Sequence, residues 1–229
     1  MHRDFADSRS LIDEKGIIPK ADEMWALRQR VAPEAPAQIS ISDNTFIDCG
    51  QVDYGSVAIC VTYANHVSIE YNFFRSLPYS AISMGWRWAP GLSNCHSNLV
   101  RGNRIEQIMQ QAGDGGGIYL VGEQPGTRIV GNYIHDSGRN YWSHGVYPDE
   151  FSDHMEISNN YVTGVMDHSI FMHKNGPNQI LRDNNGESGP TKITGTTARG
   201  TQWVKFSPER TPADLSLYGP RTLRTLEDK

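Results

Sequence analysis

Residues 129–134, Ile-Val-Gly-Asn-Tyr-Ile, place an asparagine three positions after one apolar residue and two before another. The pattern recurs along the chain, with its asparagines 24 to 31 residues apart. The copies are Ile41/Asn44/Phe46, Ile69/Asn72/Phe74, Val100/Asn103/Ile105, Ile129/Asn132/Ile134, Ile157/Asn160/Val162 and a degraded Leu181/Asn184/Gly186. A period of this length is typical of solenoids, in which each repeat stacks on the next. We therefore expect residues far apart in the sequence to lie side by side.

A second apolar segment follows each of the first five asparagines. The segments are Ala58-Ile-Cys-Val61, Ala81-Ile-Ser-Met84, Gly117-Ile-Tyr-Leu120, Gly145-Val-Tyr-Pro148 and Ser169-Ile-Phe-Met172. The Ile or Val at the second position of each points inward if the segment is a strand, because successive side chains of a strand alternate in direction. The segments are short and separated by Gly, Asn and Asp, which favours strands over helices.

These features predict an all-β fold, a right-handed parallel β-helix of about six coils. Equivalent residues of successive coils then lie about 4.8 Å apart. Each repeated asparagine sits at a bend and hydrogen-bonds the asparagines of the coils above and below it. An antiparallel sandwich is the competing fold, but hairpin turns such as Asn-Gly are scarce. A sandwich also gives no reason for an asparagine at one phase of each repeat.

The composition along the chain predicts three parts. Residues 1–37 form an N-terminal cap, because the stretch Lys20–Val31 is patterned as an amphipathic helix that could cover the open end of a solenoid. Residues 38–186 form the parallel β-helix. Residues 187–229 contain four prolines and form a C-terminal extension that packs over the last coil or trails from it.

The bulk properties exclude several classes of function. The 229-residue chain has a net charge of −5 and no long basic run, so nucleic acid is not an expected partner. A mean hydropathy of −0.52 without a long apolar run predicts no membrane span. The first residues show no signal peptide. Zinc and EF-hand spacings are absent, so we expect no metal site or cofactor; the oligomeric state is not predicted.

Outward positions of the second strands bring polar and aromatic side chains onto one face. Tyr119, Tyr147 and Phe171 follow the inward residue by one position and should form a ladder of exposed ring faces. Asp149 and His173 follow it by three positions and should be neighbours on adjacent coils. This face is therefore the candidate functional site.

Acidic residues on two consecutive coils flank that face. Asp114 lies in the glycine-rich turn Gln111–Tyr119, where glycines let the backbone bend and let a ligand approach closely. Asp149 and Glu150 follow on the next coil. Two acids held a few Å apart suit glycosidic cleavage, in which one protonates the leaving oxygen and the other attacks the anomeric carbon or activates water. The structural alternative is that Asp114 caps a turn and Asp149 is a solvated loop acid.

Further side chains near these acids are candidates for binding a sugar. Trp86 and Trp88 lie in one loop and either stack on a sugar or cover the core. His135-Asp136 and His168 are interpreted as structural. The predicted substrate-binding residues are Tyr119, Tyr147, Glu150, Trp86, Trp142, His144 and His173.

Several of these segments resemble bacterial parallel β-helix glycosidases. The chain is similar to glycoside hydrolase family 141, which includes fucosidases and xylanases, and more distantly to the β-xylosidases of family 120. The resemblance covers about residues 67–185 and depends on Tyr79-Ser-Ala-Ile-Ser-Met-Gly-Trp86, Gly113-Asp-Gly-Gly-Gly-Ile-Tyr119, Gln124-Pro-Gly-Thr127, Gly131-Asn-Tyr-Ile-His-Asp136 and Gly145-Val-Tyr-Pro-Asp-Glu150.

The resemblance implies a catalytic pair, Asp114 and Asp149, and a later histidine that corresponds to His173. It also implies a secreted or periplasmic protein that degrades carbohydrate. Pro148 stands where the family usually has an aliphatic residue. Family members are longer, with further coils and an accessory β-domain. If this chain is a fragment whose missing coils complete the site, we expect it to be inactive.

Two other functions fit the same face. A polysaccharide lyase or uronate epimerase needs a base and a cation, and only Arg139 and Lys174 are near; a calcium ion at Asp114, Asp149 and Glu150 would favour this function. A non-catalytic carbohydrate-binding β-helix needs the aromatic residues but not the acids.

Overall fold

The computed structural model describes residues 35–91, 93–139, 142–186, 191–194, 202–204 and 214–221. The chain divides into two units, residues 1–35 and 36–229, and all the described strands belong to the second. The predicted N-terminal helix, Lys20–Val31, lies outside the described residues. Within them, no helix has the length and apolar character needed to cross a bilayer.

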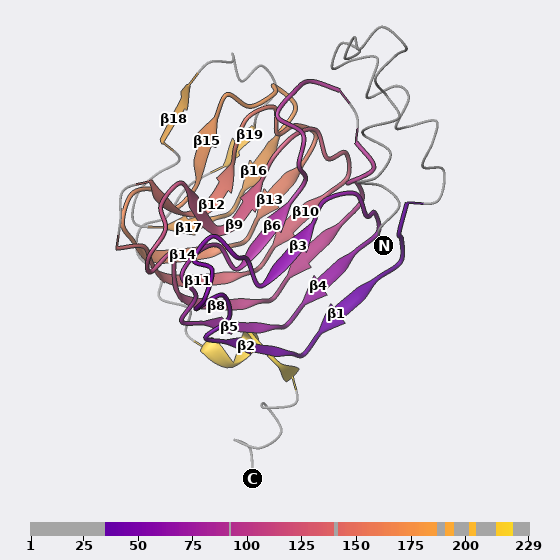
Figure 1. Cartoon of the computed structure of the whole chain (residues 1–229). Helices are drawn as coiled ribbons and strands as arrows, with labels where there is room; N and C mark the ends of the chain where they lie inside the picture. The colour runs from indigo at the N-terminus through magenta and orange to yellow at the C-terminus, as the bar shows by residue number, and fades with distance from the viewer. Residues whose placement is uncertain are drawn as a thin grey trace, which may run out of the picture. The chain divides into compact units, whose positions relative to one another are not determined.

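Short strands make up the described chain (Figure 1). In chain order they are β1 (Ser40–Ser42), β2 (Thr45–Ile47), β3 (Ile59–Val61), β4 (Ser68–Glu70), β5 (Phe73–Arg75), β6 (Ile82–Met84), β7 (Leu99–Arg101), β8 (Arg104–Ile108), β9 (Gly115–Leu120), β10 (Arg128–Val130), β11 (Tyr133–Ser137), β12 (Ser143–Pro148), β13 (Glu156–Ser158), β14 (Tyr161–Val165), β15 (Phe171–His173), β16 (Ile180–Arg182), β17 (Asn185–Gly186), β18 (Thr191–Thr194) and β19 (Gln202–Val204). A 3₁₀ helix, η2 (Leu215–Leu217), follows them.

Every third strand joins the same sheet, so that three parallel sheets surround one core. The first sheet has the order β1-β4-β7-β10-β13-β16-β19, the second β17-β14-β11-β8-β5-β2, and the third β12-β9-β6-β3. A bridge from Val146 to Ile170 aligns β15 with the third sheet, and β15 pairs with β18. The predicted parallel β-helix is confirmed.

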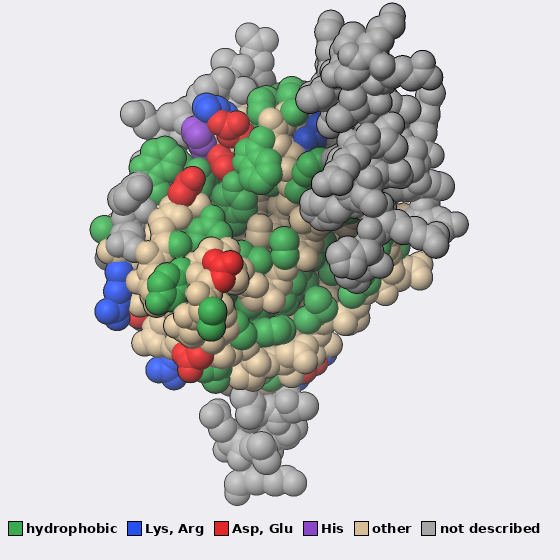
Figure 2. Space-filling view, viewed as in Figure 1, with side chains coloured by type: hydrophobic (Ala, Val, Ile, Leu, Met, Phe, Trp, Pro, Cys, Tyr) green, Lys and Arg blue, Asp and Glu red, His purple; other side chains and the backbone are tan. Residues whose placement is uncertain are grey.

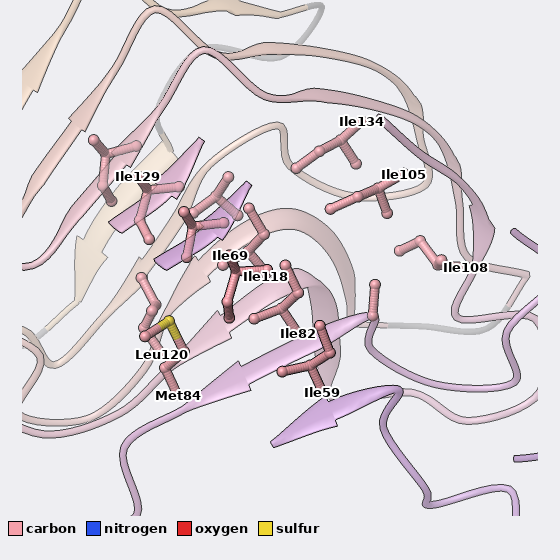
Figure 3. Close-up of a cluster of buried hydrophobic side chains, with 14 of the residues drawn as sticks. Ile59, Ile69, Ile82, Met84, Ile105, Ile108, Ile118, Leu120, Ile129 and Ile134 are labelled. Carbon is pink, nitrogen blue, oxygen red and sulfur yellow. The ribbon is translucent and has the colours of Figure 1, made fainter. Parts of the chain in front are cut away.

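The apolar residues of the repeat occupy matching rows in the core. Ile69, Val100 and Ile129 are in register in the first sheet, and the inward residues Ile82 and Ile118 are in register in the third. All five are fully buried. Figure 3 shows Ile69, Ile82, Ile118 and Ile129 inside the coils with neighbouring isoleucines. Each coil therefore buries its apolar residues against the same positions of the next coil, as the period predicts.

The repeated asparagines form a continuous ladder at the bend between the first and second sheets. The amide of Asn103 donates to Asn132 Oδ1 at 2.9 Å, and the amide of Asn132 donates to Asn160 Oδ1 at 2.9 Å. The same pairing extends from Asn44 to Asn184. From Asn72 to Asn184, each Oδ1 also accepts a backbone N–H of the preceding coil, as Asn132 Oδ1 does from Asn103. The predicted ladder is confirmed, and it satisfies polar groups at a buried bend.

Parallel pairing continues past residue 186, where the sequence pattern predicted the solenoid to end. β18 pairs with β15, and β19 pairs with β16. No asparagine of the repeat accompanies these two strands, and the ladder therefore ends at Asn184. Backbone hydrogen bonds alone can add a strand to a sheet, so the loss of the side-chain pattern does not mark the last strand.

The segment 214–221 lies on the outside of the early coils rather than over the last one. Gly219 N–H donates to the Gly102 carbonyl at 2.9 Å. Arg221 forms an ion pair with Asp43 and lies over the Tyr71 ring, with its guanidinium carbon 4.5 Å from the ring centre. A segment late in the sequence therefore contacts the first coil.

Candidate active site

The outward aromatic residues of the third sheet form a small second core. Tyr119, Tyr147 and Phe171 belong to β9, β12 and β15, and adjacent rings lie 5.2 Å apart, centre to centre. Their exposed fractions are only 9%, 1% and 9%. The three residues lie one above the other on successive coils, as the repeat predicted. Their ring faces are covered, however, so the expectation of exposed ring faces is wrong. Figure 2 shows hydrophobic side chains gathered on this face, with a histidine and acidic side chains among them.

Asp149 is held beneath this face by three hydrogen-bonding side chains. The hydroxyl of Tyr119 donates to Asp149 Oδ2 at 2.6 Å, and the hydroxyl of Tyr147 donates to Oδ1 at 3.3 Å. His173 Nδ1 lies 2.8 Å from the same Oδ1. The residue is only 7% exposed. The three contacts therefore fix the orientation of this carboxylate.

The backbone around Asp149 is fixed as well. The amide of Asn175 donates to the carbonyls of Pro148 and Asp149, at 3.0 and 2.8 Å. Asp149 N–H donates to the Leu120 carbonyl at 2.8 Å, which continues the pairing of β9 and β12. Asn175 therefore positions the turn that presents the carboxylate, a role that the sequence pattern did not indicate.

Asp114 is the more exposed of the two acids. It precedes β9 with a φ of 58°, a conformation that aspartate tolerates better than most residues. The Tyr79 hydroxyl donates to the Asp114 carbonyl at 2.7 Å and so fixes this turn. Loss of surrounding water and, next, the charge of Asp149 raise the pKa of the Asp114 carboxyl, against smaller opposing effects of Tyr147 and His173.

One hydroxyl connects the two acids. The Tyr147 hydroxyl lies 3.4 Å from Asp114 Oδ1 and 3.3 Å from Asp149 Oδ1. The sum of these distances is the largest possible separation of the two oxygens. Burial and the two nearby carboxylates raise the pKa of Tyr147, so that its hydroxyl keeps its proton. The structure thus brings together the two acids that the repeat placed on consecutive coils.

The glycines near Asp114 serve close packing. A Cβ on Gly117 would lie 2.9 Å from Ile134 Cγ2, and one on Gly116 would lie 3.0 Å from the His144 carbonyl. At the matching place on the next coil, a Cβ on Gly145 would lie 2.1 Å from Val162 Cγ1. Protein atoms therefore occupy the space beside Gly116 and Gly117, where a ligand was expected to approach, and the same holds beside Gly145.

His144 is buried within the aromatic cluster rather than open to a substrate. It is 2% exposed, and its ring lies 4.3 Å from Phe171 and 4.8 Å from Tyr147. Neither ring nitrogen has a hydrogen-bond partner in the described structure. Burial lowers the pKa of His144 to about 4, so the imidazole is neutral at neutral pH. The prediction that His144 contacts a substrate has no geometric support.

Two exposed tryptophans flank the acids. Trp88 is 56% exposed and hydrogen-bonds the Tyr119 side chain. Trp142 is 45% exposed, and its ring lies 6.1 Å from the rings of Phe171 and His173. Trp86, which the sequence analysis preferred to Trp88, is half-buried with its ring 4.7 Å from Tyr63. Trp86 and Trp88 are two residues apart in one loop, so the sequence alone does not show which of them is open to solvent.

Glu150 was predicted to bind a substrate and, in the alternative function, a calcium ion. Glu150 forms an ion pair with Lys174, which neutralises the third acid of the hypothetical calcium site. Within the described residues, no group of three or more His, Cys, Asp or Glu is arranged to hold a metal ion.

Comparisons with known proteins give three findings. A search of curated proteins finds no match. Among solved structures, the chain is similar to a protein named "Glycoside hydrolase", with a TM-score of 0.57 and 26% sequence identity; the match covers 67% of this chain and 26% of that one. The chain thus spans about a quarter of the length of that protein. A family model described as "Right handed beta helix region" matches residues 31–190. With its three parallel sheets and stacked asparagines, the chain belongs to the right-handed β-helix family.

Proposed function

We propose that the protein is a glycoside hydrolase that uses Asp114 and Asp149 as its carboxylate pair. The observation that supports this most strongly is the shared contact of both carboxylates with the Tyr147 hydroxyl. Two acids so close, in different surroundings, are what glycosidic cleavage needs. The similarity to a solved glycoside hydrolase supports the same reaction class.

The surroundings of the two acids support different roles. Asp149 is held in one orientation by Tyr119, Tyr147 and His173, which suits a nucleophile that must attack from a fixed position. Asp114 is more exposed and has a raised pKa, which suits a general acid. In the first step, Asp149 attacks the anomeric carbon while Asp114 gives its proton to the departing oxygen. In the second, Asp114 takes a proton from water, which displaces Asp149 from the sugar.

The spacing of the acids favours retention of the anomeric configuration. The largest possible separation of the two Oδ1 atoms reaches only the lower end of the range of about 6.5–9.5 Å that is typical of inverting enzymes. Retaining enzymes hold the groups about 5–5.5 Å apart, with no room for a water molecule between acid and sugar. A covalent glycosyl-Asp149 intermediate follows from this geometry.

Trp88 and Trp142 are proposed as the surfaces that hold the sugar. Each exposes its indole beside a side chain that binds Asp149, Trp88 next to Tyr119 and Trp142 next to His173. The apolar faces of sugar rings pack well on indoles, so a sugar between them would present its anomeric carbon to the acids.

The test is turnover of 4-nitrophenyl xyloside and fucoside, sugars that the family resemblance suggests, by Asp149→Asn, Asp114→Asn and the exposed control Asp183→Asn. Asp149→Asn should abolish turnover. Asp114→Asn should keep most of its kcat/KM on these activated substrates, whose leaving group needs no proton. Its kcat should fall about 10²–10⁴-fold, because water has no base in the second step. Full turnover by Asp149→Asn would contradict the assignment.

A non-catalytic carbohydrate-binding β-helix is the second candidate. The observation that favours it is the 7% exposure of Asp149, which limits access to the nucleophile. A wild-type chain that binds glycans through Trp88 and Trp142 but cleaves none of them would establish this function instead.

A further inference from the structure

A polar hollow lies at the turns between the second and third sheets. It encloses about 390 Å³, within the size range of small-ligand sites. Its lining residues come from four consecutive coils, after β2, after β5, within and after β8, and after β11. They are Asp48, Gln51, Ser76, Pro78, Gln107, Gln110, Gln111 and Arg139.

Three of the glutamines are anchored at one end. Gln51 Nε2 donates to the Ser76 carbonyl at 3.0 Å, and Gln110 Nε2 donates to the Ile108 carbonyl at 3.0 Å. Gln107 Oε1 accepts from Arg75 Nε at 3.1 Å. The anchors orient each amide before a ligand arrives, which reduces the entropy lost on binding. The opposite ends, two carbonyl oxygens and one NH₂ group, offer both acceptors and donors.

The charges of the lining favour a neutral ligand. Asp48 and Arg139 are the ionisable residues of the lining, and their charges cancel. A polyanionic chain would need an excess of positive charge, whereas sugar hydroxyls pair with amide groups as donors and as acceptors.

Two residues that line the hollow are close in sequence to residues that form or hold the Asp114 turn. Gln111 lines it three residues before Asp114, and Pro78 lines it directly before Tyr79, whose hydroxyl holds the Asp114 carbonyl. A ligand in the hollow would therefore be close to the acid that protonates the leaving group. We infer that the hollow is a subsite for neutral, hydroxyl-rich sugar units of the glycan whose bond is cleaved at Asp114 and Asp149. This inference rests on the proposed function.

Binding can test the inference separately from cleavage. Xylohexaose, cellohexaose, mannohexaose and hexagalacturonate are titrated calorimetrically into the full-length Asp149→Asn chain, with and without the pair Gln51→Ala and Gln110→Ala. We expect at least one neutral hexamer to bind, and the pair to weaken it at least fivefold. Gln38→Ala, at an exposed glutamine outside the hollow, is the control and should leave Kd unchanged.

Each other outcome contradicts either the inference or the proposed function, and they can be told apart. Binding of none of the neutral hexamers, equal binding by the double variant, or binding of hexagalacturonate alone would overturn the inference. Hexamer binding that depends on the two glutamines, in a protein whose wild type cleaves no glycoside, would leave the subsite in place and overturn the hydrolase proposal. Circular dichroism of the double variant establishes that it is folded.

Discussion

The asparagine ladder and the cluster around Asp149 are both buried polar networks, yet they follow opposite rules. In the ladder, each inner asparagine makes the same hydrogen bonds to the coils on either side. In the cluster, the position of Asp149 is occupied by Val121 on the coil before it and by His173 on the coil after it, and the two nitrogens of His144 have no partner in the described structure. The scaffold is built from positions that carry the same kind of residue on every coil. The candidate site is built from outward positions whose residues differ between coils.

Breaking the ladder at its centre should have the largest effect. Asn132 is fully buried, and its amide makes bonds to Val100, Asn160 and Asn103. Asn132→Leu should lower the free energy of unfolding by about 3–5 kcal/mol, because several buried partners lose their hydrogen bonds. Urea denaturation measures this change. Asn44→Ala, at the exposed end of the ladder, should cost less than about 1 kcal/mol; equal losses would show that the inner bonds are not special.

The unpartnered His144 should make the cluster sensitive to acid. Its pKa falls from 6.5 to about 4 on folding, so below pH 6.5 the unfolded chain binds more protons than the folded one. Stability is therefore lost as the pH falls from 6.5 to about 4, by about 3 kcal/mol from this residue. His144→Phe, which keeps the stacking on Tyr147 and Phe171, should remove this part of the pH dependence. An unchanged slope of stability against pH in His144→Phe would contradict the explanation.

The close packing beneath the cluster gives a third comparison. A Cβ on Gly145 would lie 2.1 Å from Val162 Cγ1 and 2.6 Å from the Ser169 carbonyl. Gly145→Ala should therefore cost about 1–3 kcal/mol in thermal or urea unfolding. Gly55→Ala is the control, because its Cβ would meet Asp53 Oδ1 at an ordinary 3.6 Å. If the two variants were equally stable, the close approach of β12 to β14 would not be a packing constraint.

Removing one hydroxyl from the cluster should have the smallest effect on the free energy of unfolding. Its expected effect is on catalysis. Tyr119→Phe deletes the 2.6 Å donor to Asp149. If Asp149 is the nucleophile, kcat should fall about tenfold while KM stays nearly constant, because this hydrogen bond orients the attacking carboxylate. Tyr161→Phe, on the second sheet, should change neither kcat nor KM. An unchanged kcat in Tyr119→Phe would show that this hydrogen bond does not position Asp149 for attack.

The scaffold was predictable from the sequence because stacking repeats the same contact in each coil. The in-register isoleucines and the asparagines from Asn44 to Asn184 were identified by their spacing, and so was the row that contains Tyr119 and Tyr147. The sequence pattern could not indicate that β19 continues the first sheet, because its backbone pairing requires no particular side chain. Nor could it place the segment 214–221 against Asp43.

The exposure of the site residues depended on which side chains pack over them, and the spacing of the repeat does not determine that. Outward alternation indicated that Tyr147 faces away from the core, but neighbouring side chains such as His144 and Phe171 cover it. The same packing left Trp88 exposed and Trp86 half-buried, and Tyr79 and Asn175 acquired their roles through hydrogen bonds to carbonyl groups of other turns.

The sequence by itself determined the period, the parallel β-helix and the placement of Asp114 and Asp149 on consecutive coils. These follow from short-range spacing and from backbone geometry that is the same in every coil. The tertiary structure alone decided that both acids meet the hydroxyl of Tyr147, because that contact depends on side-chain conformations across a bend. It also decided their unequal burial, since the water around a carboxylate is removed by whatever packs over it.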